Sequence, residues 1–547
     1  MLINTRHGHK ASILLFSLAL GLPGAWLLAD DTRPEPAQPA TANESDGSHF
    51  DVMEYRIEGS SKMDHRTLEK AVYPFLGPHR AIEDIEQARR ALEKLYHDAG
   101  YSATTVDIPE QDVEGGVVIL SITEGTVDRL KVTGSRYFSL GHIKEKVPSL
   151  AEGQVLNLGK AQEELAKVAG ESPDRSITPV MRAGRTPGTV EVDLEVDDTL
   201  PLHGGVEMNG RNSINTERLR MVGTIRYDNL WQRYHSVSLQ YQTAPENYDN
   251  LEVWAGTYVM PVEALDSRLV FYGIGLQSTS SSVASTGSMN VVGTGDIYGL
   301  RLIKPLPGVA RFMHSVTLGW DYKDFGQSVG LMGSDSQNTP ISYSPFYAAY
   351  SGGYNFENGS LSQFNVEADF SLRGLGNSQS EFENKRYGAR SDYLYVATDL
   401  KHKQVLPYDM RLLARFSGQV ADSPLISNEQ FTAGGWQTVR GYHETEVLGD
   451  DGVMGSLEMH SPDLAALKLE GMEQMRFLAF VDAARAWVKS PLPRTPRSYD
   501  LSSVGVGFRS QWMKHIVGEL DWEYPMSRTN YIHPGQQRVD FRVGYEF

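Results

Sequence analysis

The 547-residue sequence contains no cysteine. Disulfide bonds, thiolate metal sites and cysteine nucleophiles are therefore excluded together. Basic residues are also in deficit, because 51 Lys and Arg face 69 Asp and Glu, which gives a formal net charge of -18. A protein that binds nucleic acid normally carries a concentrated basic surface, so we expect no nucleic-acid partner.

Long apolar runs are almost missing as well. A helical membrane protein would show several runs of about 20 apolar residues, whereas here the one candidate lies near the N-terminus. Arg6 and Lys10 precede the apolar run Ala11 to Leu20, and a small residue, Ala29, follows it. This order is typical of a cleaved secretory signal peptide, which we place at residues 1–29.

Common motifs of enzymes are also scarce. The sequence has no P-loop pattern G-x-x-x-x-G-K-S/T and no zinc-protease pattern H-E-x-x-H, and its 15 histidines are scattered. These patterns would place phosphate-binding amides or paired metal ligands on one turn of the chain. We therefore expect a protein that is not an enzyme, with no cofactor and no metal.

The N-terminal part of the mature chain has the pattern of a small α+β unit that occurs twice. Residues 30–49 are rich in Pro, Ala, Asp, Glu and Ser, and we predict a disordered linker there. From Phe50 the pattern indicates a strand, two helices and two strands, and the same order recurs from Val127. Two related modules in tandem, at residues 50–125 and 126–200, are the economical interpretation.

Beyond Leu202, apolar and polar residues alternate to the end of the chain. The final strand is the clearest, with Val539, Phe541, Val543, Tyr545 and Phe547 on one face and Arg538, Asp540, Arg542, Gly544 and Glu546 on the other. We count about sixteen such segments of about ten residues, as in an even-numbered membrane barrel. A soluble β-sandwich also alternates, but polar faces that carry both charge signs favour a hydrated lumen. We predict an all-β transmembrane barrel at residues 201–547, closed because lipid cannot satisfy backbone groups.

One late stretch, residues 427–452, does not alternate and falls between the eleventh and twelfth predicted strands. It contains Val439-Arg440-Gly441-Tyr442, preceded by Gly434 and Gly435, which are residue types suited to a tight tip. A later strand contains Phe480-Val481-Asp482-Ala483-Ala484. Neither motif is specific alone, and their value lies in the context of the whole chain.

Together, the VRGY loop, the later F-x-D strand, two modules similar to POTRA domains and the terminal Phe547 resemble a known family. It is the outer-membrane transporters of two-partner secretion, the ShlB/FhaC/HecB type within the Omp85 superfamily. The resemblance implies that the loop folds back into the lumen and that Arg440 pairs with Asp482, next to Phe480 in the barrel wall. A planar guanidinium suits such a bidentate pair. The resemblance also implies that Phe547 is the signal read by the barrel assembly machinery.

The sequence departs from this family in two places. Ala484 stands where the family usually has glycine, and we expect its methyl group to crowd the loop against the wall. Many members also carry an N-terminal helix that plugs the pore, but the proline-rich residues 30–49 give no indication of one.

The resemblance implies a pore in the outer membrane with its modules in the periplasm. The modules would bind the N-terminal secretion domain of an unfolded exoprotein, such as an adhesin, a haemolysin or a contact-dependent toxin. The exoprotein would then pass to the cell surface without nucleotide hydrolysis. Other expected partners are outer-membrane lipid, lipopolysaccharide and the barrel assembly machinery, and we expect a monomer.

Three alternatives stay open on the sequence. An Omp85-type factor that inserts other outer-membrane proteins typically carries more POTRA modules than the two predicted here. A diffusive porin has no use for tandem periplasmic modules. An outer-membrane enzyme would need a set of catalytic residues, and we identify none.

Overall fold

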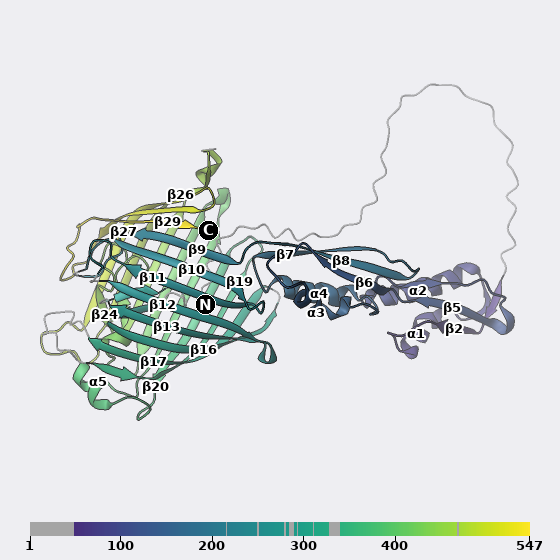
Figure 1. Ribbon diagram of the computed structural model, residues 1–547, viewed down its shortest axis with the longest axis horizontal. Coiled ribbons are helices and arrows are strands. Elements are labelled where there is room, and N and C mark those ends of the chain that lie inside the picture. The colour runs from purple at the N-terminus through teal and green to yellow at the C-terminus, as the bar shows by residue number, and fades with distance from the viewer. Residues whose placement is uncertain are drawn as a thin grey trace, which may run out of the picture. The chain divides into compact units, whose positions relative to one another are not determined.

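A computed structural model describes residues 49–214, 216–248, 251–277, 280–283, 289–292, 294–309, 311–327, 340–467 and 470–547 (Figure 1). The predicted signal peptide and the predicted linker, apart from its last residue, lie outside these residues. The chain divides into an N-terminal unit that ends at Leu200 and a C-terminal unit that runs from Pro201 to Phe547. No described helix has the length and apolar character needed to cross a membrane.

The first module of the N-terminal unit is a small sheet covered by two helices. Its elements are β1 (Phe50–Val52), β2 (Glu54–Glu58), α1 (His65–Val72), β3 (Gly77–Arg80), α2 (Ile82–Asp98), β4 (Thr105–Asp107) and β5 (Val117–Thr123). The sheet order is β2-β5-β4, with β2 parallel and β4 antiparallel to β5, and β1 pairs with β3 separately. One face of α2 is apolar and fully buried, so Ala88, Leu92 and Tyr96 form the core with Leu120 of β5.

The second module repeats this topology. It consists of β6 (Thr126–Thr133), α3 (Leu140–Glu145), α4 (Leu158–Ala169), β7 (Arg175–Ala183) and β8 (Thr189–Asp198). The sheet order is β6-β8-β7, again with a parallel pair and an antiparallel pair. The two modules are therefore similar in strand pairing as well as in sequence pattern.

A carboxylate at the end of the last strand closes each module in the same way, Glu124 directly after β5 and Asp198 as the final residue of β8. In the first module, Glu124 accepts a hydrogen bond from the backbone N–H of Ser61 at 2.8 Å. In the second, Asp198 accepts one from the backbone N–H of Arg136 at 2.9 Å. Burial raises the pKa of Glu124, but the hydrogen bonds it receives outweigh burial and lower its pKa below the usual value. The pKa of Asp198 is lowered by the same balance.

The C-terminal unit is a closed antiparallel barrel (Figure 1). Its strands are β9 (Leu202–Asn209), β10 (Arg220–Leu230), β11 (His235–Thr243), β12 (Glu252–Val262), β13 (Ser267–Gln277), β16 (Thr294–Val309), β17 (Phe312–Gln327), β18 (Ile341–Tyr343), β19 (Pro345–Asn355), β20 (Leu361–Ser371), β21 (Leu394–Val405), β22 (Arg411–Ala421), β25 (Asp451–His460), β26 (Met472–Trp487), β27 (Ser498–Trp512), β28 (Ile516–Pro525) and β29 (Arg538–Glu546). β18 and β19 both pair with β17 and count as one interrupted strand, which gives 16 in the described chain. The predicted fold class is therefore confirmed.

The two faces of the wall differ as the alternation predicts. On β28 and β29, the outward Leu520, Val543 and Tyr545 are 47%, 53% and 51% exposed, whereas the inward Asp521 and Asp540 are buried. Apolar side chains thus cover the outside of the barrel and charged side chains fill its inside. The last strand pairs with the first, β29 with β9, and so leaves no edge.

Five short elements of the described chain lie in the connections between barrel strands. They are the hairpin of β14 (Ser280–Val283) and β15 (Met289–Val292), the helix α5 (Gln379–Lys385), and the pair of β23 (Phe431–Ala433) and β24 (Val447–Gly449). The β23–β24 pair belongs to the connection between β22 and β25, the eleventh and twelfth barrel strands.

Candidate functional site in the barrel lumen

The connection from β22 to β25 folds into the barrel as a hairpin. β23 and β24 pair at its base, and Gly434 and Gly435 follow β23 with φ values of +109° and +104°. A Cβ atom at Gly434 would lie 2.5 Å from the Cβ of Glu446, so this turn requires glycine for both conformation and space. The hairpin tip carries Val439 and Arg440, which are 0% and 1% exposed.

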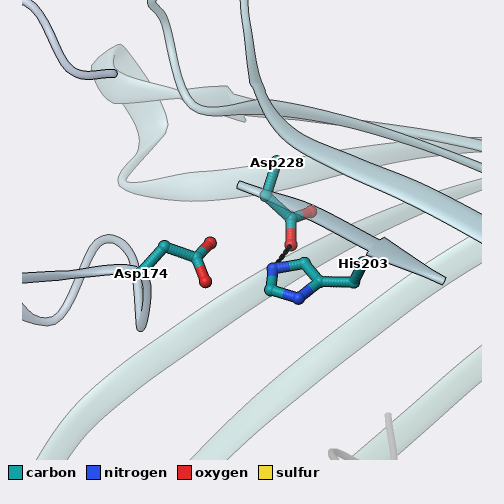
Figure 2. A group of neighbouring side chains, drawn as sticks. All are labelled: Asp174, His203 and Asp228. Carbon is teal, nitrogen blue, oxygen red and sulfur yellow. Dashed lines mark ion pairs between the residues drawn. The ribbon is translucent and has the colours of Figure 1, made fainter. Parts of the chain in front are cut away.

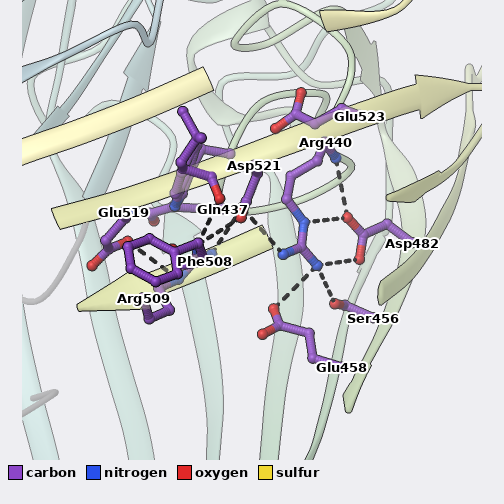
Figure 3. Close-up of polar contacts among 12 residues, drawn as sticks. Gln437, Arg440, Ser456, Glu458, Asp482, Phe508, Arg509, Glu519, Asp521 and Glu523 are labelled. Atoms are coloured by element: carbon purple, nitrogen blue, oxygen red, sulfur yellow. Dashed lines mark hydrogen bonds and ion pairs between the residues drawn. The ribbon is translucent and has the colours of Figure 1, made fainter. Parts of the chain in front are cut away.

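Arg440 forms a bidentate pair with Asp482 of β26 (Figure 3). Its Nε donates to Asp482 Oδ2 at 2.7 Å and its Nη2 donates to Asp482 Oδ1 at 2.8 Å. The backbone N–H of Arg440 also donates to Oδ2, at 3.2 Å. The guanidinium carbon lies 3.4 Å from the centre of the Phe480 ring, so the cation also stacks on an aromatic face.

Two further carboxylates surround the same guanidinium. Glu458 of β25 approaches Arg440 Nη2 at 3.1 Å, and Asp521 of β28 approaches Nη1 at 3.6 Å. Each of these carboxylates also has a second cation, because Arg415 lies 3.0 Å from Glu458 and Arg509 lies 2.5 Å from Asp521. With Asp482 these residues make three cations and three anions, so each of these charges has a partner of opposite sign.

The remaining residues of the motif fix the loop on both sides of the arginine. Gly441 has a φ of +89°, and its backbone N–H donates to Glu523 of β28 at 2.6 Å. The Tyr442 hydroxyl donates to the backbone oxygen of Ser502 at 2.9 Å and contacts Ser527 in the β28–β29 connection. The loop is thus attached to strands β25 to β28 through backbone and side-chain contacts.

Ala484 lies in the apolar contact between loop and wall. It is 7% exposed and belongs to a buried cluster with Val439, Tyr442, Phe431 and Met454. The loop side chains therefore pack around the methyl group that the sequence leads us to expect as an obstacle.

Several residues of this site are missed by sequence patterns. The guanidinium groups of Arg211 and Arg509 each lie 5.2 Å from the ring centre of Trp436 in the loop. Alternation places Glu458, Arg509 and Asp521 inward. It gives no signal for which inward residues meet the loop tip, since that depends on the curvature of the wall.

Phe547 lies directly after β29 at the seam of the barrel. Its backbone N–H donates to the oxygen of Gly204 at 2.9 Å, and its ring is 52% exposed on the outer face. A Cβ atom at Gly204 would lie 2.6 Å from Phe547 Cζ, so the ring covers the glycine.

Two other features of the C-terminal unit have the chemistry of sites but support none. His203 Nε2 of β9 lies 3.7 Å from Asp228 Oδ2 of β10 (Figure 2), and two ligands are fewer than the three that a catalytic zinc needs. Residues 326–330 read GQSVG, a match to the G-x-S-x-G motif of hydrolases. That motif requires a strand-to-helix turn, but β17 ends at Gln327 in the barrel wall and residues 328–339 lie outside the described residues.

Comparison with known proteins identifies the family of the chain. A model of the POTRA domain, ShlB-type, matches residues 50–125, and a model of the haemolysin secretion/activation protein ShlB/FhaC/HecB matches residues 188–510. The outer membrane transporter CdiB of Dickeya dadantii is 23% identical over 532 residues, with 92% of this chain and 88% of CdiB covered. The heme/hemopexin transporter protein HuxB of Haemophilus influenzae is 19% identical over 423 residues, covering 76% and 73%.

Solved structures share the fold. CdiB from Escherichia coli has a TM-score of 0.62 at 18% identity, with 93% of each chain covered. BamA from Haemophilus ducreyi lacking POTRA domains 1–3 has a TM-score of 0.54 at 14% identity, with 91% of this chain and all of that chain covered. The secretion-protein model spans more than half of the sequence. The chain therefore belongs to the haemolysin secretion/activation protein family ShlB/FhaC/HecB, the outer-membrane transporters of two-partner secretion within the Omp85 superfamily.

Proposed function

We propose that this chain is a gated pore that binds an unfolded exoprotein in the periplasm and secretes it to the cell surface without nucleotide hydrolysis. One observation carries the proposal, namely the buried Arg440, which fastens an inserted loop to the inner wall of a closed barrel. A loop that is held by four strands occupies part of the lumen and limits free diffusion through it. A pore that must pass a polypeptide and otherwise stay sealed needs such an element.

The fastening is strong but contains no covalent bond. Removing one partner from a buried ion pair costs about 3–5 kcal/mol, because the other charge is left without compensation. Displacement of the intact loop costs much less free energy than loss of one partner, because water then hydrates both charges. Arg440 and Asp482 therefore suit a loop that rests in one position and is displaced when cargo enters.

The two modules are the proposed receptor for the cargo, with boundaries at residues 50–125 and 126–200. The secretion-type POTRA match covers the first, and the second has the same sheet order. Each three-stranded sheet has two edge strands, β2 and β4 in the first and β6 and β7 in the second. An edge strand pairs with an extended segment through backbone groups, which suits an unfolded secretion domain.

The test of the proposed function is a deletion strain of the source organism. We expect mass spectrometry of the medium and cell surface to show the loss of one large exoprotein, an adhesin, a haemolysin or a contact-dependent toxin, and its return on complementation. A broad loss of outer-membrane proteins without loss of any exoprotein would instead favour the alternative, an Omp85-type factor that inserts barrels.

The same strain tests the loop. We expect Arg440→Ala to abolish or sharply reduce export while the barrel stays inserted, because Asp482 is left as a buried, uncompensated charge. Arg485→Ala is the matched control, since Arg485 lies on the same strand as Asp482 but its side chain is 50% exposed. Equal export by the two variants would remove the proposed role of the loop.

A further inference from the structure

The base of the inserted loop is fastened to a different part of the wall from its tip. Glu429, which lies two residues before β23, is 4% exposed and accepts a hydrogen bond from Lys323 Nζ of β17 at 2.6 Å. The hydroxyl groups of Tyr343 in β18 and Tyr395 in β21 donate to the same carboxylate. Arg440 at the tip instead binds carboxylates of β25, β26 and β28. Buried ion pairs therefore hold the loop at both its base and its tip.

Apolar packing also holds the base of the loop. Leu425 and Ile426 are each 1% exposed and belong to one buried cluster with Phe325 of β17 and Tyr343 of β18. Loss of the Arg440 contacts alone would leave this packing and the ion pair at the base in place. Displacement of the whole loop therefore needs a second step at the base.

The wall beside the base contains a buried carboxylate that has no partner. Asp369 of β20 is 6% exposed, and within the described chain its Oδ1 accepts no hydrogen bond and its carboxylate joins no ion pair. Its neighbours in the sheet are Tyr347 and Tyr395, whose hydroxyl groups donate to Glu367 and Glu429 instead. A buried carboxylate without a partner is costly in free energy. The arrangement at Asp369 therefore favours a second state in which this carboxylate is paired.

Lys323 is the cation that can supply this partner. Its ammonium group interacts electrostatically with two carboxylates of the wall, Asp321 and Asp369, as well as with the loop. Asp321 is already satisfied, because Arg301 donates to its two oxygens at 2.5 and 2.7 Å and the Tyr272 hydroxyl donates at 2.6 Å. Lysine carries a compact charge on a flexible four-carbon chain, so it can exchange partners without movement of the backbone. Of the two wall carboxylates, Asp369 is the one that lacks a partner in the described chain.

From these observations we propose that Lys323 is a positioning residue with two alternative partners. It binds Glu429 while the base of the loop occupies the lumen, and it binds Asp369 once the base has moved away. The proposal rests on the proposed function and adds a step to the displacement of the loop. Because one buried ion pair replaces another, removal of Glu429 does not leave Lys323 as an uncompensated charge. The exchange therefore lowers the free energy of the displaced state.

The conductance of the full chain in planar lipid bilayers tests the exchange, because the two carboxylates should act with opposite sign. Glu429→Gln weakens the resting state, since an amide cannot compensate the charge of Lys323, and we expect the open fraction to rise about tenfold. Asp369→Asn removes the partner of the displaced state alone, and we expect the open fraction to fall about tenfold. An unchanged or raised open fraction in Asp369→Asn would overturn the proposal, as would an unchanged or lowered one in Glu429→Gln.

Two further variants separate the exchange from a general effect on the wall. Asp369→Glu keeps the charge and should restore the wild-type open fraction. Glu367→Gln is the matched control, because Glu367 lies on the same strand two residues away but already accepts hydrogen bonds from Tyr347 at 3.0 Å and Asn365 at 2.7 Å. We expect this control to leave the open fraction unchanged. A fall equal to that in Asp369→Asn would mean that the loss of any carboxylate on β20 has this effect, and the exchange would be wrong.

The effect of Asp369 must also depend on Lys323. In a Lys323→Met background we expect Asp369→Asn to cause no further change, since the cation that it would bind is absent. A fall as large as in the wild-type background would assign Asp369 to another partner and overturn the exchange. Heat-modifiable migration on gels verifies that each barrel is folded. Conductance requires no cargo, so these outcomes concern the exchange alone, whereas a deletion strain that keeps all its exoproteins would overturn the proposed function.

Discussion

Arg440 contacts three carboxylates, and all three determine the effect of substituting this arginine. Asp482 supplies the bidentate contact, while Glu458 and Asp521 add charge at 3.1 and 3.6 Å. The sequence motif points to a single ion pair between Arg440 and Asp482. The geometry instead makes the arginine one member of a balanced cluster, so that its charge is needed by more than one strand.

Exchanging the two charges should therefore fail to restore export. In the double variant Arg440→Asp and Asp482→Arg, the new aspartate would face Glu458 and Asp521, and like charges at this distance repel. We expect export no better than in Arg440→Ala alone. Recovery to about half of wild-type secretion, measured by quantitative immunoblotting of the medium, would show that the pair acts in isolation.

Single residues also show where sequence-based prediction stops. The pairing of Arg440 with Asp482 could be predicted because the family resemblance involves both the loop and the strand. The contacts of Glu458, Asp521 and Trp436 could not, because they join residues from strands that are distant in sequence. Periodicity indicates the inward face of a strand. It carries no information on which inward side chain lies opposite an inserted loop.

At the level of elements, the two modules share a turn that depends on glycine. Gly59 follows β2 and Gly134 follows β6, with φ values of +87° and +89°. A Cβ atom would lie 2.1 and 2.2 Å from the backbone oxygens of Ile122 and Val196, respectively. The turn therefore packs directly against the last strand, next to the carboxylate that closes the module.

Substitution of either glycine by alanine should destabilise its module. We expect Gly59→Ala and Gly134→Ala to increase amide hydrogen exchange in the affected module, since the conformation alone costs about 1–2 kcal/mol and the clash adds to it. Gly153→Ala is the control. Gly153 also has a positive φ, of +84°, but a Cβ atom there would have no neighbouring atom within 4 Å. An equal response of Gly153→Ala would mean that backbone conformation, not contact with the last strand, determines stability.

Element boundaries follow from the sequence only where side chains carry the signal. The helix α2 was predictable from its apolar stripe, and the last strand from its alternation. β1 and β3 were not, because β3 contains Gly77 and Pro78, which are unfavourable for strands. The barrel strands β16, β17 and β26 reach 16 residues, whereas about ten suffice to span lipid, so their excess length lies beyond the apolar pattern.

At the level of the whole molecule, closure of the barrel depends on the residues at its seam. Phe547 joins Gly204 through two backbone hydrogen bonds and covers it with its ring. Its proposed second role, as the signal for the assembly machinery, would act before the barrel exists. Both roles concern the amount of barrel that reaches the membrane rather than the activity of each pore.

We expect Phe547→Ala to lower the amount of folded barrel in the outer membrane severalfold, as measured by heat-modifiable migration on gels. Phe477→Ala is the matched control, because Phe477 is also an outward aromatic residue, with 50% exposure compared with 52% for Phe547. A similar loss in both variants would indicate that outward aromatic surface in general, and not the terminal position, governs assembly.

The charges around the loop predict the ion selectivity of the pore in its conducting state. When the loop leaves, it takes Arg440 with it, and the wall keeps Asp482, Glu458 and Asp521 against Arg415 and Arg509. The vacated sector then carries a net negative charge, and rings of carboxylates favour cations in a pore. Reversal potentials in a potassium chloride gradient should therefore show cation selectivity in the conducting state, and anion selectivity would mean that the arginine stays behind.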